Sequence, residues 1–213
     1  TSGNGLQSKH NVSVNGSKGG TKYLFSVGYL SQDGIVEKTN YDRYDYRLNL
    51  ETKVRNNLTL SVKLAGNFSD QNSPAMMSTE NSVGGFDAIL RAATEANATE
   101  PGAKSDGTYG THMGHPTASA GLNSPSFQDN KNTYSMDNFS FEWKIIPELK
   151  LTTRLGYDIN YQKGDNYSSI LSWDNQTVVQ GPSKLQVNTS NNKNLTLDSY
   201  FDYEKTCSSR HYL

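Results

Sequence analysis

The sequence predicts an all-β fold that is part of a large antiparallel transmembrane β-barrel, with about seven strands and long external loops. Three observations carry this prediction: segments that alternate apolar and polar residues, the great length of several segments, and connections that alternate between short and long. Successive side chains of a strand point to opposite faces, so each segment has one apolar and one polar face. In a membrane barrel these faces meet lipid and lumen, and average hydropathy stays low, in keeping with the mean hydropathy of −0.73.

Composition excludes several other classes. The net charge of −1 provides no basic surface for nucleic acid. No uninterrupted apolar run approaches the roughly 18 residues that a transmembrane helix needs. The single cysteine, Cys207, excludes an internal disulfide framework and a metal site built from several cysteines. The sequence therefore predicts no nucleic-acid partner and no cofactor.

The alternating segments predict seven long strands. A globular strand has about 5–6 residues, whereas a tilted strand that crosses a membrane needs about 9–11. Several segments are longer still and fit a large barrel whose strand ends stand clear of the bilayer. The predicted strands, with boundaries good to a few residues, lie at 9–15, 21–31, 40–54, 57–69, 132–146, 148–163 and 190–205.

The alternation is clearest in four of these strands. Residues 23–29 are apolar at every odd position, and residues 44–51 are apolar at every even position. Residues 58–64 are again apolar at even positions, while residues 139–145 are apolar at odd positions. The strands at 148–163 and 190–205 repeat the pattern with Leu149, Leu151, Leu155, Tyr157 and Ile159, and with Leu195, Leu197, Phe201 and Tyr203.

Every second connection is short. Turns fall at Gly16–Gly20, Arg55–Asn57 and Ile146–Glu148, and the connections at 32–39, 71–131 and 164–189 are longer. An up-and-down barrel of an outer membrane has this asymmetry, whereas a soluble sandwich has no reason to place all its long loops at one end.

The longest connection is predicted to contain one short helix. Phe86, Ile89, Leu90 and Ala93 follow helical spacing within residues 86–96, and Pro101 with Gly102 ends the element. A loop of this length is usually functional or mobile.

Aromatic residues are predicted to form two girdles at the membrane surfaces, because amphipathic rings favour the headgroup level. One set lies near the short turns: Tyr23, Trp143 and Tyr203. The other lies near the long loops: Tyr29, Tyr44, Phe68 and Tyr161. The alternative is ordinary cross-strand aromatic pairing in a soluble sheet.

The alternation also assigns residues to the two faces. The predicted lipid-facing residues are Phe25, Leu48, Leu60, Val62, Phe141, Leu151, Leu155 and Leu197. The predicted residues of the polar face, which line a lumen or contact a plug, are Arg47, Lys63, Glu142, Arg154 and Asp158. Their mixed signs favour contact with a plug over a solute path.

The stretch at residues 9–69 resembles the start of the barrel in the SusC/RagA class of TonB-dependent outer-membrane transporters. The resemblance is looser from there to about residue 160. The matching pieces are the Asn-Gly-Ser turn before Lys22-Tyr23, Val27-Gly28-Tyr29-Leu30, Asp33-Gly34-Ile35, and Tyr41-Asp42-Arg43-Tyr44 leading into Arg47-Leu48-Asn49-Leu50. The segment after the loop helix departs from the Pro-rich family pattern, since it holds only Pro101.

The resemblance implies that residues 1–213 are a fragment of a TonB-dependent receptor β-barrel domain, without the plug domain and the remaining strands. Seven strands do not close a barrel of about 22 strands, which is the plugged-transporter class. The expected location is the outer membrane of a Gram-negative, Bacteroidetes-type bacterium.

The resemblance also implies transport without covalent chemistry. Members of the family import oligosaccharides, oligopeptides or similar nutrients through a plugged barrel. The implied partners are a SusD-like surface lipoprotein that caps the barrel, the TonB complex acting through the missing plug, outer-membrane lipid, and a glycan or peptide substrate. No enzymatic activity is expected.

Two loop aromatics, Tyr109 and Trp173, are candidate contacts for a ligand or for the lipoprotein, because a ring can stack on a sugar face; simple loop packing is the third possibility. Asp106, His112 and His115 occur close together, but zinc sites prefer three or four ligands on ordered elements, so no metal site is predicted.

Two rival functions remain open. A soluble β-sandwich that acts as a carbohydrate-binding or adhesin module explains the alternation but not the one-sided long loops. A polysaccharide-degrading enzyme needs two carboxylates that converge, and Glu142 with Asp158 is the only tempting pair.

Overall fold

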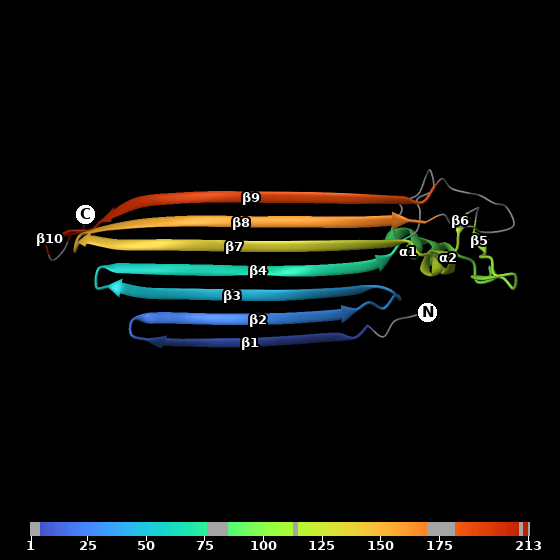
Figure 1. Cartoon of the computed structure of the whole chain (residues 1–213), viewed down its shortest axis with the longest axis horizontal. Helices are drawn as coiled ribbons and strands as arrows, with labels where there is room; N and C mark the ends of the chain where they lie inside the picture. Colours follow the sequence, from blue (N-terminus) through green and yellow to red (C-terminus); the bar gives the residue numbers. More distant parts are fainter. Residues whose placement is uncertain (1–4, 76–84, 113–114, 170–181, 209–210, 213) are drawn as a thin grey trace.

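A computed structural model describes residues 5–75, 85–112, 115–169, 182–208 and 211–212. Seven long strands form one antiparallel sheet in the order β1-β2-β3-β4-β7-β8-β9 (Figure 1). All seven predicted strands are confirmed, and each lies beside its neighbours in sequence. Their bounds are β1 Gln7–Lys18, β2 Thr21–Asp33, β3 Asn40–Arg55, β4 Leu58–Pro74, β7 Phe127–Ile146, β8 Leu149–Ser168 and β9 Lys184–Tyr203.

The short turns all lie at one end of the sheet and the long connections at the other (Figure 1). The first turn is tighter than predicted, because Lys18 pairs with Thr21 and leaves only two residues between the strands. These are Gly19 and Gly20, with φ of 60° and 83°. Two-residue hairpin turns with positive φ at both positions suit the twist of the flanking strands and favour glycine. The predicted up-and-down arrangement is confirmed.

At the long-loop end, the strands run further than predicted. β4 continues to Pro74, β7 already begins at Phe127, and β8 continues to Ser168. The predicted 71–131 connection is therefore shorter in the structure. These strand ends are polar, and at the start of β7 charged residues alternate with amides, so they have no hydrophobic periodicity to reveal them.

The short-turn ends are staggered across the sheet. Thr21, the first residue of β2, pairs with Thr52, and Thr52 pairs with Leu60. At this end of the sheet, β4 therefore extends two residues further than β2, to Leu58. Trp143 pairs with Leu58, and β7 continues three residues further to Ile146. Figure 1 shows these turns stepping outward from the β1-β2 hairpin to the β7-β8 hairpin. A barrel with tilted strands requires such a stagger.

The register separates the two faces as the alternation predicts. Directly paired residues share a face, and one row runs from Phe25 through Leu48 to Leu64. The eight predicted lipid-facing residues lie on this apolar face, and the five predicted lumen-facing or plug-facing residues lie on the opposite, polar face. The environment that each face meets stays a prediction.

The aromatic residues near the long loops form a row on the apolar face. Tyr29 pairs with Tyr44 and Tyr44 with Phe68, and Tyr161 lies in the same row through Thr133. The rings of Tyr29 and Tyr44 stack with centroids 4.8 Å apart, and those of Tyr44 and Phe68 are 6.5 Å apart. The register thus places the predicted outer girdle in one line across the strands.

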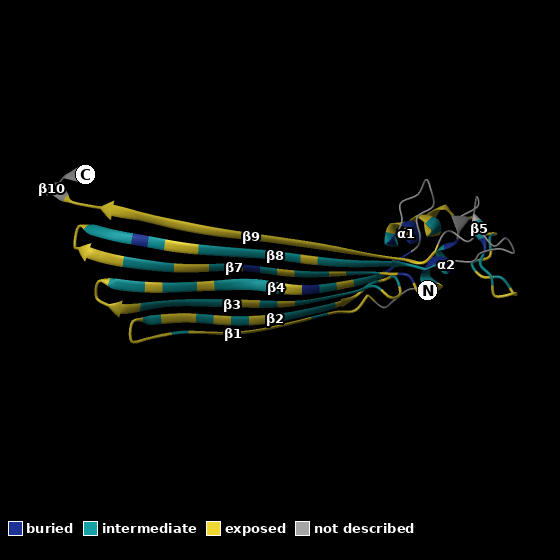
Figure 2. Cartoon of the chain, turned by 45° about the horizontal axis from the view of Figure 1, so that its top comes forward, coloured by how far each residue is buried: buried dark blue, intermediate teal, exposed yellow. Residues whose placement is uncertain are grey.

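The sheet is a single layer with no core of its own. Figure 2 shows mostly intermediate and exposed residues along its strands, and the few buried ones include the polar residues Ser69, Ser135 and Thr152. The buried apolar side chains among the described residues are Ala75, Ala88, Ile89 and Ala120, all near the long loops. An apolar face this extensive is stable in water only when something covers it.

A small helical unit lies at the long-loop end (Figure 1). Helix α1, Phe86–Glu95, confirms the predicted helix and packs Ala88 and Ile89 against Ala118 and Leu122. One helix and four short strands were not predicted from the sequence. They are α2 Ala118–Asn123, β5 Thr111–His112, β6 His115–Pro116, β10 Thr206–Ser208 and β11 His211–Tyr212. Neither described helix is long and apolar enough to cross a membrane.

Gly66 permits a cross-strand contact on the apolar face. The Tyr46 hydroxyl shares a hydrogen bond of 2.8 Å with Ser135 Oγ, which donates to Asp137 Oδ1 at 3.0 Å. These two hydrogen bonds link β3 to β7 across β4. A Cβ at Gly66 would lie 2.6 Å from Tyr46 Oη and too close to the carbonyl oxygen of Tyr134. Gly66 therefore leaves the space in which the Tyr46 ring lies.

The variant Gly66→Ala is expected to lower the stability of the full-length protein by about 1–3 kcal/mol, because the added methyl group displaces the Tyr46 ring. Equilibrium unfolding by urea in lipid vesicles measures the loss. Gly28→Ala is the matched control, since its Cβ would meet Asn11 Oδ1 at 3.4 Å and Asp45 Cβ at 3.5 Å, which are ordinary contacts. Equal effects of the two variants would contradict this role of Gly66.

Candidate functional site

The polar face of the sheet is the candidate functional surface. Arg47 and Asp158 share one register row on it, through Ala65 and Met136. Lys63, Glu142 and Arg154 occupy further rows of the same face. The structure therefore gathers the five predicted residues on one surface but not in one cluster.

Charges of both signs concentrate near the short turns. Lys22 Nζ lies 3.2 Å from Glu51 Oε1, and Lys150 Nζ lies 3.2 Å from Asp202 Oδ2. The Arg154 guanidinium lies 5.6 Å from the centre of the Tyr200 ring. Exposed ion pairs contribute little to stability. Their arrangement instead provides a surface that a partner with mixed charges can match.

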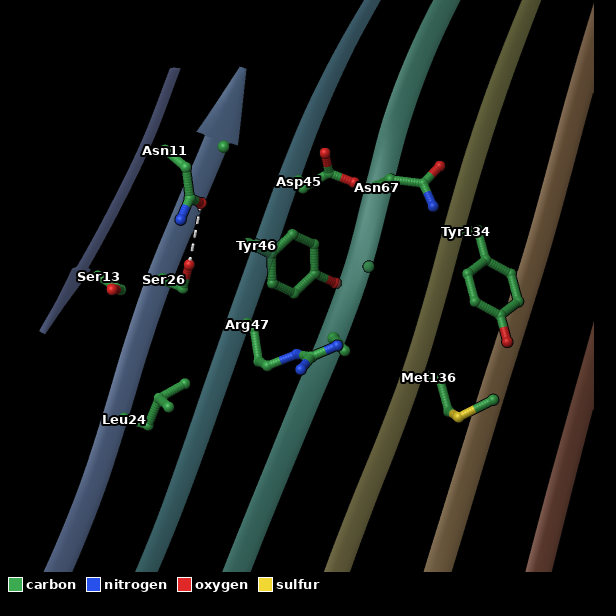
Figure 3. Close-up of a pocket in the computed structure, with 13 residues that line it drawn as sticks. Asn11, Ser13, Leu24, Ser26, Asp45, Tyr46, Arg47, Asn67, Tyr134 and Met136 are labelled. Carbon is green, nitrogen blue, oxygen red and sulfur yellow. Dashed lines mark hydrogen bonds between the residues drawn. The ribbon is translucent and has the colours of Figure 1, made fainter. Parts of the chain in front are cut away.

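A polar hollow of about 520 Å³ lies further from the turns, over β1 to β7 (Figure 3). Asn11, Ser26, Asp45 and Arg47 are among the residues that line it. Ser26 Oγ donates a hydrogen bond of 3.2 Å to Asn11 Oδ1. Donors, acceptors and both charges are available here, but no nucleophile paired with a base is among the described lining residues.

The carboxylate pair of the enzyme hypothesis does not converge. Glu142 pairs with Thr152, and Asp158 lies six residues further along β8. At about 3.3 Å per residue this separates the two carboxylates by roughly 20 Å along the strand. Glycosidase carboxylates are about 5–9.5 Å apart, so this pair does not have the geometry of a glycosidase.

A second hollow, of about 630 Å³, lies at the rim between the 34–39 loop, α1 and the polar strand ends. Gln128 Oε1 accepts a hydrogen bond of 3.3 Å from the backbone N–H of Phe86, the first residue of α1. Lys38 Nζ donates to the carbonyl of Leu122, at 2.5 Å, and so ties the 34–39 loop to α2. These contacts hold the helical unit at the edge of the polar face.

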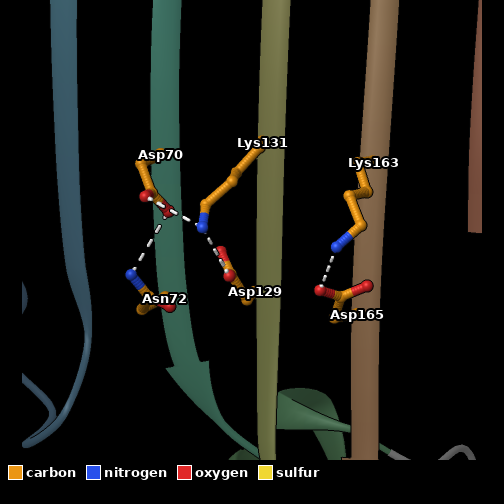
Figure 4. A network of polar contacts seen from close by, with 6 residues as sticks. All are labelled: Asp70, Asn72, Asp129, Lys131, Lys163 and Asp165. Carbon is orange, nitrogen blue, oxygen red and sulfur yellow. Dashed lines mark hydrogen bonds and ion pairs between the residues drawn. The ribbon is translucent and has the colours of Figure 1, made fainter. Parts of the chain in front are cut away.

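An ionic network lies on the apolar side, one row beyond the aromatic row (Figure 4). Lys131 Nζ lies 3.1 Å from Asp129 Oδ2 and 3.7 Å from Asp70 Oδ2. Lys163 Nζ lies 2.7 Å from Asp165 Oδ2. These residues mark where the apolar surface ends. They were not among the predicted site residues, although charged residues alternate with amides at 128–132 and with amides and a glycine at 162–166.

Of the candidate metal ligands, the structure describes the side chain of Asp106. Asp106 Oδ1 accepts hydrogen bonds from the hydroxyl of Thr108 at 2.6 Å and from its backbone N–H at 2.9 Å. These bonds hold the pKa of Asp106 below its usual value, the hydroxyl having the larger effect. Asp106 thus stabilises its own turn, and no group of three metal-ligating side chains occurs among the described residues.

The structure describes one of the two candidate loop aromatics, Tyr109. Tyr109 forms an isolated β-bridge with Ala103 and packs against buried Ala120. This contact favours the packing interpretation of Tyr109. Trp173 lies outside the described residues.

Comparisons with known proteins agree with this geometry. No family model matches the chain. TonB-dependent receptor P26 of Formosa agariphila is 22% identical over 204 residues, which cover 94% of this chain and 19% of that protein. The RagAB peptide importer in its closed-closed state is similar with a TM-score of 0.67 and 16% identity, over 95% of this chain and 22% of that one. Its open-open state has a TM-score of 0.68 with the same identity and coverage.

The seven-stranded sheet is therefore similar in fold to a portion of a TonB-dependent barrel. The likeness to RagAB, whose RagA component is of the SusC type, bears out the resemblance to SusC/RagA-type TonB-dependent transporters. The chain spans about a fifth of the length of the proteins that it matches. The similar proteins are named as receptors and importers, not as enzymes.

The variant Tyr109→Ala is expected to increase the rate at which a protease cleaves residues 101–124, because it removes the ring that packs on Ala120. Limited proteolysis of the purified full-length protein measures this rate, and Tyr109→Phe, which keeps the ring, is the control. Unchanged proteolysis of the alanine variant would contradict the packing role and favour a contact with a ligand or partner.

Proposed function

We propose that this chain forms part of the barrel wall of a TonB-dependent transporter that imports a nutrient across the outer membrane of a Gram-negative, Bacteroidetes-type bacterium. The continuous register of seven strands with one apolar and one polar face is the observation that carries the proposal. Lipid covers the apolar face, and the polar face meets the lumen and a plug domain. The imported nutrient is an oligosaccharide or an oligopeptide.

Two partners belong to this proposal. A SusD-like lipoprotein closes over the outer end, where the long connections and the α1-α2 unit lie. The name RagAB of the similar structures supports a two-component assembly. The TonB complex acts on the plug, and the mixed charges on the polar face near the short turns are suited to hold that plug.

The soluble sandwich is the rival function, and the described sheet does not favour it. A sandwich buries the apolar face of one sheet against a second sheet about 10 Å away. Among the described residues the seven strands form one layer, and Phe25 and Leu197 on its apolar face are 49% and 67% exposed. A lipid layer covers such a face without a second sheet.

The variant Leu64→Arg is expected to reduce insertion of the full-length protein. Leu64 lies on the apolar face between the rows of Tyr23 and Phe68, and a cation on the lipid face near the bilayer midplane costs about 2–4 kcal/mol. Ser61→Arg is the matched control, since its side chain lies on the polar face, in the row of Glu51 and Ser140. Outer-membrane fractionation, with heat-modifiable migration as the folded marker, measures insertion. Normal insertion of both variants would argue against the lipid face.

Uptake of the substrate is expected to stop when TonB is removed, because a plugged barrel opens only under work from the inner membrane. Uptake of labelled oligosaccharide and oligopeptide pools by cells with and without TonB measures this. A surface lipoprotein should co-purify with the full-length protein. Uptake that persists without TonB would indicate a passive channel instead.

A further inference from the structure

The outer parts of β7, β8 and β9 carry an unusual block on the polar face. It consists of the even-numbered positions in 128–134, 160–166 and 186–192, here called the amide wall. Nine of these twelve residues are Asn or Gln, and the other three are Tyr134, Gly164 and Ser190. None of the twelve is charged.

The register makes the amide wall one continuous surface. Gln128 pairs with Asn166 and Asn166 with Gln186, and this pattern continues row by row to Tyr134, Asn160 and Asn192. Neighbouring strands lie about 4.8 Å apart, so side chains in adjacent rows and strands are within reach of one ligand. Figure 1 shows the three strands side by side along these segments.

The abundance of asparagine in the chain does not explain this block. The nine odd-numbered positions within the same ranges face the other side, and they include only one amide, Asn191, but four charged residues. On the polar face itself, charges reappear nearer the short turns, at Asp158, Arg154 and Glu142. The amides of these strands are therefore concentrated on one face and in its outer part.

Three of these amides have a side-chain oxygen without a hydrogen-bond partner. The Oδ1 atoms of Asn132, Asn160 and Asn166 are buried and have no hydrogen-bond partner within the described structure. Buried polar atoms are almost always hydrogen-bonded in folded proteins, and an exception calls for an explanation such as an ordered water or a bound ligand.

We propose that the amide wall binds a neutral oligosaccharide and discriminates against charged solutes, an inference that rests on the proposed import function. Sugar hydroxyls donate and accept as amides do, so each amide can bond to neighbouring hydroxyls. A carboxylate or an ammonium group would lose water at this surface without an opposite charge to replace it. Acidic saccharides and peptides with charged ends therefore fit it less well. Tyr134 adds a ring face within the same block.

The test uses the full-length transporter with its lipoprotein, purified in detergent. Three probe pools are offered separately: neutral oligosaccharides from plant and algal polysaccharides, uronic-acid oligosaccharides, and tryptic peptides. Mass spectrometry identifies the species that are retained, and titration gives their affinities. The double variant Asn132→Ala/Asn160→Ala is compared with Asn191→Ala, which removes an amide from the opposite face.

We expect retention of neutral oligosaccharides, weakened about tenfold by the double variant and unchanged by Asn191→Ala, because two hydrogen-bonding groups are lost. Outer-membrane levels and lipoprotein co-purification should be equal for all variants. Retention of only acidic saccharides or peptides overturns the inference but leaves the import function standing. Neutral retention that is insensitive to the double variant overturns it as well. Failure of both retention and lipoprotein co-purification overturns the import function too.

Discussion

The structure depends on one constraint, the antiparallel register of seven strands. Side chains alternate faces with a period of two, so a slip of one residue would exchange the apolar and polar faces of a strand. The row from Phe25 through Leu48 to Leu64 exists only because three strands keep the same register. Turn geometry supports it: Gly19 and Gly20 close the first hairpin, and a β-bulge beside Arg55 adjusts the second.

Because the sheet is a single layer, its two surfaces rather than an interior determine what it does. The apolar surface ends toward the long connections. There a row of aromatic rings is followed by the charged side chains of Asp70, Lys131 and Lys163. The position of this change near the long connections accords with strands that project beyond a bilayer. The only described apolar cores belong to the small helical unit, which the polar strand ends hold through Gln128.

The polar surface changes along β7 to β9, although β3 carries the Arg43–Asp45 ion pair further from the short turns. Near the short turns it carries charges of both signs, as in the Lys22–Glu51 and Lys150–Asp202 pairs. Toward the long connections, on β7 to β9, the same surface is neutral and built of amides. Such a division suits a barrel in which a protein plug occupies one part and a solute passes the other, since each contact requires different chemistry.

The sequence by itself determined the seven strands, their order, the two faces and helix α1, because these depend on local periodicity and turn residues. It did not determine the outer strand ends, where Asp and Lys alternate with Asn and Gln and hydropathy has no period. Only the tertiary structure separated Glu142 from Asp158, brought Tyr109 onto Ala120, and assembled the amides of three strands into one surface. The first and third relations depend on which residues pair across strands, and the second on how a loop packs on α2. Period-two alternation within one strand decides which face a residue takes but not which residue it pairs with.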